Sequence, residues 1–197
     1  MKHFIKEWGL FILFITLFAL SRAFIWQPVK VEGHSMDPTL ADGERLIVLS
    51  HTSISRFDII VASEGEGTQE KKIVKRVIGM PGDTISYKDD VLYVNDEKVE
   101  EPYLSTYLKA FNDNKLQSIY SYNTLFQNLA IASDAFTTDS AGNPDFTVEV
   151  PQGEYFLLGD DRIVSKDSRE VGTFKESDII GEVKFRFWPL TEIGTVK

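Results

Sequence analysis

The stretch "KKIVKRVIGMPGD", residues 71–83, joins a nine-residue run rich in β-branched side chains to an immediate turn. In a strand, Lys75 shares one face with Ile73 and Val77, while Arg76 lies on the opposite face, which is also apolar. The letters "MPGD" place Pro second and Gly third, which suits a type II turn because Gly tolerates a positive φ. The stretch therefore predicts a strand that is apolar on both faces near its middle, carries Lys75 on one face and Arg76 on the other there, and ends in a tight turn.

Similar short runs continue on both sides of this stretch and alternate with Gly, Pro and Asp. The alternation is typical of a mainly β domain, and no segment reads as a long amphipathic helix. Asp89-Asp90 separates two runs as a hairpin tip would, and residues 64–69 read as a flexible polar loop. We expect strands at 28–32, 45–50, 57–62, 72–79, 84–87, 91–94, 146–150, 154–158 and 179–187.

Residues 101–145 break this pattern, because they are rich in Ser, Asn, Asp and Tyr and have weak periodicity. Strand-like alternation resumes at residue 146. The chain is long enough for one core with a smaller appended lobe. We therefore predict one β core built from residues 28–100 and 146–197, with residues 101–145 inserted as a small lobe of short helices.

The charge of the chain is unevenly distributed. The formal net charge is −9, but residues 1–30 carry four basic side chains and one acidic side chain, a local charge of +3. The rest of the chain therefore carries about −12, which makes the body a poor partner for nucleic acid. The chain has no cysteine, so it forms no disulfide and offers no thiol nucleophile.

Residues 8–26 form a nearly uncharged run that begins and ends with tryptophan. A helix of this length measures roughly 28 Å, near the hydrocarbon thickness of a bilayer, provided that Arg22 reaches the interface. We predict that residues 1–27 are a cytoplasmic N-terminus and a transmembrane anchor; a cleavable secretory signal and a buried helix are the alternatives. Lys2 and Lys6 favour a cytoplasmic N-terminus, which would place the body outside the cytoplasm.

Ser35, within "EGHSMDPTLADGE" (32–44), is a candidate nucleophile that would need a base within hydrogen-bond reach. Most serines are surface or capping residues, so whether Ser35 is a nucleophile depends on which residues lie near it. His3 falls on the predicted cytoplasmic side, and His34 is poorly placed because adjacent residues of an extended chain point to opposite faces. A Ser-His-Asp triad would therefore depend on His51 alone.

Lys75 offers another base if burial removes its charge. A free lysine titrates near about 10.4, so neutrality at pH 7 requires roughly 4 kcal/mol of destabilisation of the ammonium. Its neighbour Arg76 cannot act in this way, because a guanidinium stays protonated. The alternative for Lys75 is an ordinary strand lysine whose amine reaches water.

The segment "GDDRIVSKDSR" (159–169) is rich in side-chain donors and acceptors and reads either as a solvated loop or as part of a site. Ser165 could hydrogen-bond a neutral lysine and orient it. Asp167 and Arg169 lie two residues apart and could pair to hold the loop, although an exposed pair of this kind contributes little.

Three segments in this order, "GHSMDPTL" (33–40), "KRVIGMPGD" (75–83) and "GDDRIVSKDSR" (159–169), resemble the type I signal peptidases, or leader peptidases. These are membrane-bound Ser/Lys proteases that remove signal peptides from exported proteins. The likeness covers nearly the whole chain outside 101–145, and the single anchor with a short insertion is similar to the compact form of Gram-positive bacteria.

The resemblance implies a mainly β catalytic core with an inserted lobe, and no metal or cofactor. It implies that Ser35 is the nucleophile and contributes its backbone N–H to the oxyanion hole, and that Lys75 is the general base. Ser165 would orient the lysine, and Asp167 with Arg169 would form a structural pair.

The chain departs from the family pattern at a few positions. Gly33 stands where some members have a serine that helps to stabilise the oxyanion, so the site should depend more on backbone N–H groups. Asp161-Arg162 stands where Asn-Arg is common, and Val164 where a polar residue is common. These differences concern the geometry of the loop rather than the Ser-Lys pair.

The implied substrates are preproteins cut after small residues at positions −3 and −1, with the peptide bound extended along residues 29–35. The implied partners are signal peptides, the lipid bilayer and the protein export machinery, and the implied location is the plasma membrane with the catalytic body on its extracytoplasmic face. Met36, with Phe and Trp residues near the C-terminus, would form either an apolar rim facing the membrane or part of the core.

Two other classes of protein use similar residues. A self-cleaving repressor with a Ser/Lys centre would carry a DNA-binding domain in place of the anchor, and a non-enzymatic membrane-tethered binding module would lack the nucleophile or the base. The small-x-small triplet at 130–132 in the insertion also raises the hypothesis of self-cleavage after Ala132.

Overall fold

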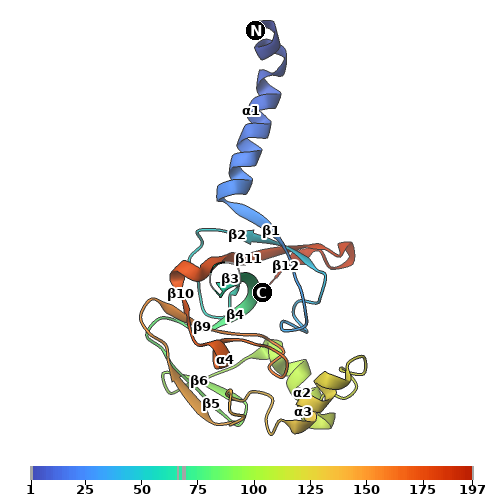
Figure 1. The fold of residues 1–197 in the computed structure, drawn as a ribbon, viewed down its shortest axis with the longest axis vertical. Helices are drawn as coiled ribbons and strands as arrows, with labels where there is room; N and C mark the ends of the chain where they lie inside the picture. The colour runs from blue at the N-terminus through green and yellow to red at the C-terminus, as the bar shows by residue number, and fades with distance from the viewer. Residues whose placement is uncertain (1, 66, 68–69, 197) are drawn as a thin grey trace.

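The computed structural model describes residues 2–65, 67 and 70–196, so residues 66, 68 and 69, half of the predicted 64–69 loop, lie outside the described residues. A long helix projects from a body of two β-sheets, and short helices lie at the far end of that body (Figure 1). The helical elements are α1 (Lys2–Phe24), η2 (Pro102–Leu104), α2 (Ser105–Asn114), α3 (Thr124–Ala132), α4 (Ser168–Val171), η3 (Glu176–Asp178) and η4 (Leu190–Glu192).

The strands confirm a mainly β fold. They are β1 (Trp26–Lys30), β2 (Arg45–Leu49), β3 (Ile59–Glu64), β4 (Lys71–Gly79), β5 (Thr84–Lys88), β6 (Val91–Val94), β7 (Glu97–Val99), β8 (Phe146–Glu149), β9 (Glu154–Leu158), β10 (Phe174–Lys175), β11 (Ile179–Trp188) and β12 (Gly194–Thr195). The sequence did not predict β7, β10 and β12, because each has three residues or fewer and too little alternation to be recognised.

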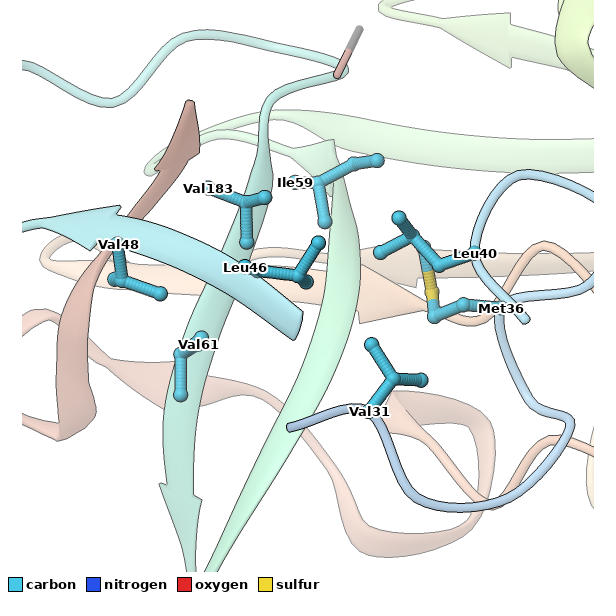
Figure 2. Close-up of a cluster of buried hydrophobic side chains, with 8 residues drawn as sticks. All are labelled: Val31, Met36, Leu40, Leu46, Val48, Ile59, Val61 and Val183. Carbon is cyan, nitrogen blue, oxygen red and sulfur yellow. The ribbon is translucent and has the colours of Figure 1, made fainter. Parts of the chain in front are cut away.

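The larger sheet has the order β1-β2-β11-β3-β4-β9-β10, and β12 pairs with β11. Its antiparallel strands enclose an apolar cluster, into which the loop after β1 sends the side chains of Met36 and Leu40 (Figure 2). Met36 is 1% exposed, so it belongs to the core and cannot form a rim that faces the membrane. This packing fixes the loop that carries Ser35.

The smaller sheet has the order β7-β6-β5-β8 and follows the predicted turns. Asp83 N–H donates to the Met80 carbonyl at 3.0 Å, and Gly82 has φ +86°, as a type II turn requires. Asp89 and Asp90 both have positive φ between β5 and β6, which confirms the hairpin tip.

The segment 101–145 contains η2, α2 and α3, and within its described residues no strand is present. Its helices enclose a cluster of their own that includes Tyr107, Phe111 and Tyr120. The smaller sheet pairs β5, before this segment, with β8, after it. The division into a core and an inserted lobe stays a prediction, and the name lobe is used below for residues 101–145.

The helix α1 ends at Phe24 and β1 begins at Trp26, so the last two residues of the predicted 1–27 anchor region belong to the sheet. Apolar side chains of α1 are exposed around the helix, and Trp26 contacts Phe18 at a ring distance of 5.9 Å. Within the described part of the chain, no helix combines the length and the apolarity needed to cross a membrane. The transmembrane anchor therefore stays a prediction.

Candidate active site

Ser35 and Lys75 lie 40 residues apart in the sequence but meet in the structure, with Lys75 Nζ 2.7 Å from Ser35 Oγ. Lys75 comes from β4 in the interior of the larger sheet, and Ser35 lies on the loop after β1. Lys75 is 4% exposed, although it carries an ionisable amine. The structure therefore holds a hydroxyl and a buried amine in hydrogen-bond contact.

The environment of Lys75 weakens its basicity. Burial lowers the pKa of the amine from 10.5 to about 8, and the nearby carboxylates of Asp167 and Glu64 only partly oppose this change. Within the described residues, Lys75 Nζ contacts Ser35 and forms no ion pair. At pH 7 about one tenth of such an amine is neutral, so it can accept a proton from the serine.

The next residue of β4, Arg76, is also buried but is fully paired. Its Nε lies 2.8 Å from Asp160 Oδ1 and its second nitrogen lies 2.6 Å from Oδ2, a two-point contact. Thr39 Oγ1 also donates to Asp160, and the Tyr103 ring lies 3.9 Å from the guanidinium carbon. This pair connects the β core to the loop that begins at Gly159.

The 159–169 loop is held by Asp167 and Arg169. Arg169 Nε and its terminal nitrogen contact the two oxygens of Asp167 at 2.8 and 2.9 Å, and the Gly159 N–H donates to the same carboxylate. Burial would raise the pKa of Asp167, but the Arg169 guanidinium holds it below its usual value. The pair is buried, so it holds the loop more firmly than a surface pair would.

Ser165 lies on this loop, but its contacts differ from those expected. Its Oγ is buried and makes no hydrogen bond of good geometry among the described residues, but it interacts with the Asp167 carboxylate and helps to lower the pKa of that group; no bond to Lys75 is formed. A side chain at Gly159 would fall 2.2 Å from Ser165 Oγ and 2.3 Å from the Ser35 carbonyl oxygen. Gly159 therefore permits the loop to pass directly behind Ser35.

The backbone around Ser35 is fixed on both sides. The Asp161 N–H donates to the Ser35 carbonyl at 3.1 Å, and the Gly33 N–H donates to Asp42 at 2.8 Å. Gly33 has φ +86°, a conformation that disfavours any residue with a side chain. Within the described residues, the Ser35 N–H donates no hydrogen bond, so it is free to bind an oxyanion.

Neither candidate histidine contacts Ser35 Oγ. His34 Nδ1 lies 2.9 Å from Asp37 Oδ2, and its ring packs on the lobe. His51 follows β2 and lines a separate small pocket with Ile54 and Glu176. A Ser-His-Asp arrangement around Ser35 is therefore absent from the described residues.

Sequence reasoning missed several residues near the site. Glu64 pairs with Lys71 and Lys166 at 3.0 and 3.2 Å and ties β4 to the 159–169 loop. Arg162 is buried and pairs with Glu101 at 2.6 Å, which ties the same loop to the start of the lobe. These partners lie far apart in the sequence, and the density of charges in 159–169 was their only signal.

Ser35 and Lys75 open into a groove of about 690 Å³. Residues 28–36 form one wall and residues 71–75 the other, and Phe126 of α3 and Val164 also line it. β1 is an edge strand, and β9 joins β4 only from Arg76 onward, so both walls present open backbone edges. Among the described residues, no group of His, Cys, Asp or Glu side chains could hold a metal ion.

Comparisons with known proteins identify the family of the chain. The family model described as signal peptidase, peptidase S26, matches residues 5–188. The chain is 60% identical to signal peptidase I of Streptococcus pneumoniae strain R6, over 98% of each chain. It is 38% identical to signal peptidase IB of Staphylococcus aureus strain COL, over 98% of this chain and 94% of that one.

A crystal structure of a signal peptidase I from Enterococcus faecalis V583 is 30% identical, with a TM-score of 0.47, and the match covers 68% of this chain and 98% of that chain. The family-model match extends across most of the chain, and the relatives match almost all of it. The chain therefore belongs to the signal peptidase family, peptidase S26, whose members are peptide hydrolases.

Proposed function

We propose that this protein removes N-terminal signal peptides from exported preproteins, with Ser35 as the nucleophile and Lys75 as the general base. The observation that carries the proposal is the 2.7 Å contact between Ser35 Oγ and a buried Lys75 Nζ that has no carboxylate bound to it. A serine needs a base within hydrogen-bond reach, and a lysine can serve only when its charge is removed.

In the proposed reaction, neutral Lys75 takes the Ser35 proton while Oγ attacks the scissile carbonyl. The Ser35 N–H and neighbouring backbone donors stabilise the tetrahedral oxyanion. The Lys75 ammonium returns its proton to the leaving amine, which leaves an ester between Ser35 and the signal peptide. A water that loses its proton to Lys75 then hydrolyses this ester, and the protonated lysine returns the proton to Ser35.

The loop residues have supporting parts in the proposal. Asp167 and Arg169 keep the 159–169 loop in place behind the base. Ser165 Oγ is buried and makes no hydrogen bond of good geometry within the described residues, so it is available to bond Lys75 Nζ once Ser35 Oγ is acylated. Gly33 shapes the approach to Ser35, and Met36 holds the loop in the core.

The substrate should bind as an extended strand between the two open edges of the groove, which residues 28–35 and 71–75 provide. Small side chains at positions −3 and −1 would fit against the apolar walls that include Val31, Ile73 and Val74. Larger side chains at these positions should be excluded, because the walls pack against the core.

We also propose that α1 anchors the protein in the plasma membrane, with a cytoplasmic N-terminus and an extracytoplasmic body. The helix exposes Leu10, Phe11 and Ile12, which follow one another at about 100° steps around the axis, and this suits contact with lipid all round. In the body, Pro28, Ile47 and Phe185 are aligned across β1, β2 and β11. These strands lie at the end of the body from which α1 projects (Figure 1). Exposed residues near the C-terminus, Trp188, Leu190 and Ile193, extend this apolar area.

The topology can be tested by cysteine labelling, because the chain has no natural cysteine. His3→Cys and Lys109→Cys, each as the single cysteine, are treated in intact cells with a membrane-impermeant maleimide. We expect labelling at residue 109 without lysis and at residue 3 only after lysis. Labelling of both positions in intact cells would mean that α1 does not cross the bilayer.

The function is tested by incubating detergent-solubilised protein with signal-bearing precursors and determining the new N-termini. We expect a cut after a small residue, abolished by Ser35→Ala and by Lys75→Ala, with the circular dichroism spectrum unchanged. Export machinery is a further proposed partner, and co-purification from membranes tests it.

A further inference from the structure

We propose that three aromatic rings, His34, Tyr122 and Phe126, form a binding subsite for the first residues of the mature chain, on the leaving-group side of the cut. The proposal rests on the proposed function, and it adds a specificity role for the lobe. These residues are called the aromatic triad below. The triad joins the residue next to Ser35 to α3 and the turn before it.

The three rings contact one another. The His34 ring centroid lies 5.3 Å from that of Tyr122 and 5.7 Å from that of Phe126, and the latter two lie 6.2 Å apart. Asp37 fixes the His34 ring through a 2.9 Å contact at Nδ1. Phe126 also packs edge-on against the buried Tyr120, so the triad stands on the core of the lobe.

The triad is continuous with the catalytic groove and is still open to solvent. His34 and Phe126 line the same groove as Ser35 and Lys75. Tyr122 is 57% exposed, which is unusual for a large ring that is already held by two neighbours. An aromatic surface beside a peptide-binding groove is suited to bury a further side chain.

The direction of the groove places the triad beyond the cut. Lys72 donates to Gln27 at 2.9 Å, which brings the starts of β1 and β4 together three residues after the end of α1. From that end, both walls run toward Ser35 and Lys75. The lobe lies at the pole of the body opposite α1 (Figure 1).

A signal peptide precedes the cut and carries an apolar segment that enters from the bilayer, so it would occupy the end of the groove near Gln27. The residues after the cut then continue toward the opposite end. There they meet Phe126 of α3, which lines the groove and contacts the ring of His34, the residue immediately before Ser35. The first residues of the mature chain are therefore the occupant to which the triad is open.

The chemistry of the triad favours a flat or bulky apolar side chain, because rings at 5–6 Å with tilted planes leave edges and faces for a further ring. This preference is opposite to that for positions −3 and −1, where small side chains are expected. The enzyme would thus exclude bulk before the cut and select bulk after it.

The test uses precursors that are identical through the cut and carry either Ala-Ala-Ala or one Phe at position +1, +2 or +3. The measured quantity is the ratio of kcat/KM for the best Phe substrate to that for the alanine substrate. We expect a ratio of roughly 3 to 10 for the wild-type protein. Tyr122→Ala should lower the ratio to about 1, and Tyr122→Phe should preserve it.

Leu125→Ala is the matched control, because Leu125 lies in the adjoining first turn of α3, is 63% exposed and does not line the groove. Its ratio should equal that of the wild type. A wild-type ratio near 1, or an equal ratio in Tyr122→Ala, would overturn the subsite while leaving the proposed function intact. Failure of the wild type to cut any of the precursors would instead overturn the proposed function, and the subsite with it.

Discussion

The two faces of β4 each hold one buried cation, and the protein treats them in opposite ways. Lys75 is 4% exposed and Arg76 is 1% exposed, so both lose nearly all contact with water. Arg76 faces a carboxylate that matches its two nitrogens, whereas Lys75 faces the hydroxyl of Ser35. Lys75 and Arg76 are therefore both buried but differ in the group that they contact.

The difference shows how one strand supports both a structural contact and a reactive group. A buried cation with a bound carboxylate keeps its charge and ties two segments together. A buried cation without one is destabilised in its charged form, which brings its pKa toward the pH at which the protein works. The paired face of β4 therefore holds the structure, while the unpaired face presents the amine that we propose as the base.

The largest expected effect comes from removing the reactive cation. Lys75→Ala and Lys75→Arg should each reduce kcat/KM by at least about 1,000-fold, because neither side chain can accept the Ser35 proton. Cleavage of a signal-bearing precursor measures the loss. Lys109→Ala on exposed α2 should cleave as the wild type does. Activity within tenfold of the wild type in Lys75→Arg would show that the neutral amine is not the base.

Breaking the structural pair should mainly affect stability. Asp160→Ala leaves the buried Arg76 guanidinium without its carboxylate, which should lower the free energy of unfolding by about 3–5 kcal/mol. Urea denaturation of the detergent-solubilised chain measures this quantity. The double variant Arg76→Met/Asp160→Leu should recover most of the loss, since it leaves no uncompensated charge. A loss below about 1 kcal/mol in Asp160→Ala would contradict the comparison.

Lys75→Met should make the protein more stable at neutral pH while abolishing activity. The unfolded lysine keeps its proton up to about pH 10.5, and the folded one releases it near 8, a difference of about 3 kcal/mol. The wild type is therefore destabilised by its buried ammonium below pH 8, and this destabilisation disappears as pH rises to 10.5. Urea denaturation at pH 7 and pH 10.5 should show the advantage of Lys75→Met only at the lower pH.

The same pKa sets the pH dependence of cleavage. Because the neutral amine is the active form, kcat/KM should fall about tenfold per pH unit below pH 8 and level off above it. Asp161 adds a possible second transition, since burial raises its pKa to about 7. The Asp161→Asn profile separates the two groups. A flat profile from pH 6 to pH 8 would exclude Lys75 as the titrating base.

The sequence revealed the reactive residues better than the supporting ones, for a physical reason. Lys75 could be separated from Arg76 because only a lysine can lose its proton, which is a property of the residue type. The partner of Arg76 was not predicted, because Asp160 lies 84 residues away and only the folding of β4 beside the 159–169 loop brings them together. The type of a residue therefore indicates part of its chemical role, whereas the pairing of residues far apart in the sequence depends on the topology of the fold.

For the fold, too, the features with a local sequence signal were predicted and those that depend on long-range contacts were not. The strands with clear alternation and the turn at 80–83 were predicted, because their signals lie within a few neighbouring residues. The direction of a loop side chain is not a local property, and Met36, expected at either a rim or a core, proved to be core. The contact of His34 with α3 was likewise invisible, since it joins the loop after β1 to the lobe.

The smallest expected effect concerns two buried serines, Ser165 and Ser168. As with Lys75 and Arg76, one of the two has a well-formed structural partner and the other does not. Ser168 Oγ accepts from the Leu157 N–H at 2.9 Å, whereas Ser165 Oγ makes no hydrogen bond of good geometry among the described residues and has only a weak interaction with the Asp167 carboxylate. Ser168→Ala should lower the free energy of unfolding by about 1–3 kcal/mol, since it leaves a buried N–H unpaired. Ser165→Ala should change it by less than about 0.5 kcal/mol, because no well-formed hydrogen bond is lost.

For catalysis we expect the opposite ranking, in which Ser165→Ala has the larger effect. Ser165→Ala should reduce kcat by less than about tenfold, and Ser168→Ala should leave kcat nearly unchanged. A small loss in Ser165→Ala fits a hydroxyl that assists Lys75 only after Ser35 is acylated, and single-turnover measurements should then place the loss in hydrolysis of the ester. A loss of 100-fold or more in the acylation step would show that Ser165 orients the lysine before the attack.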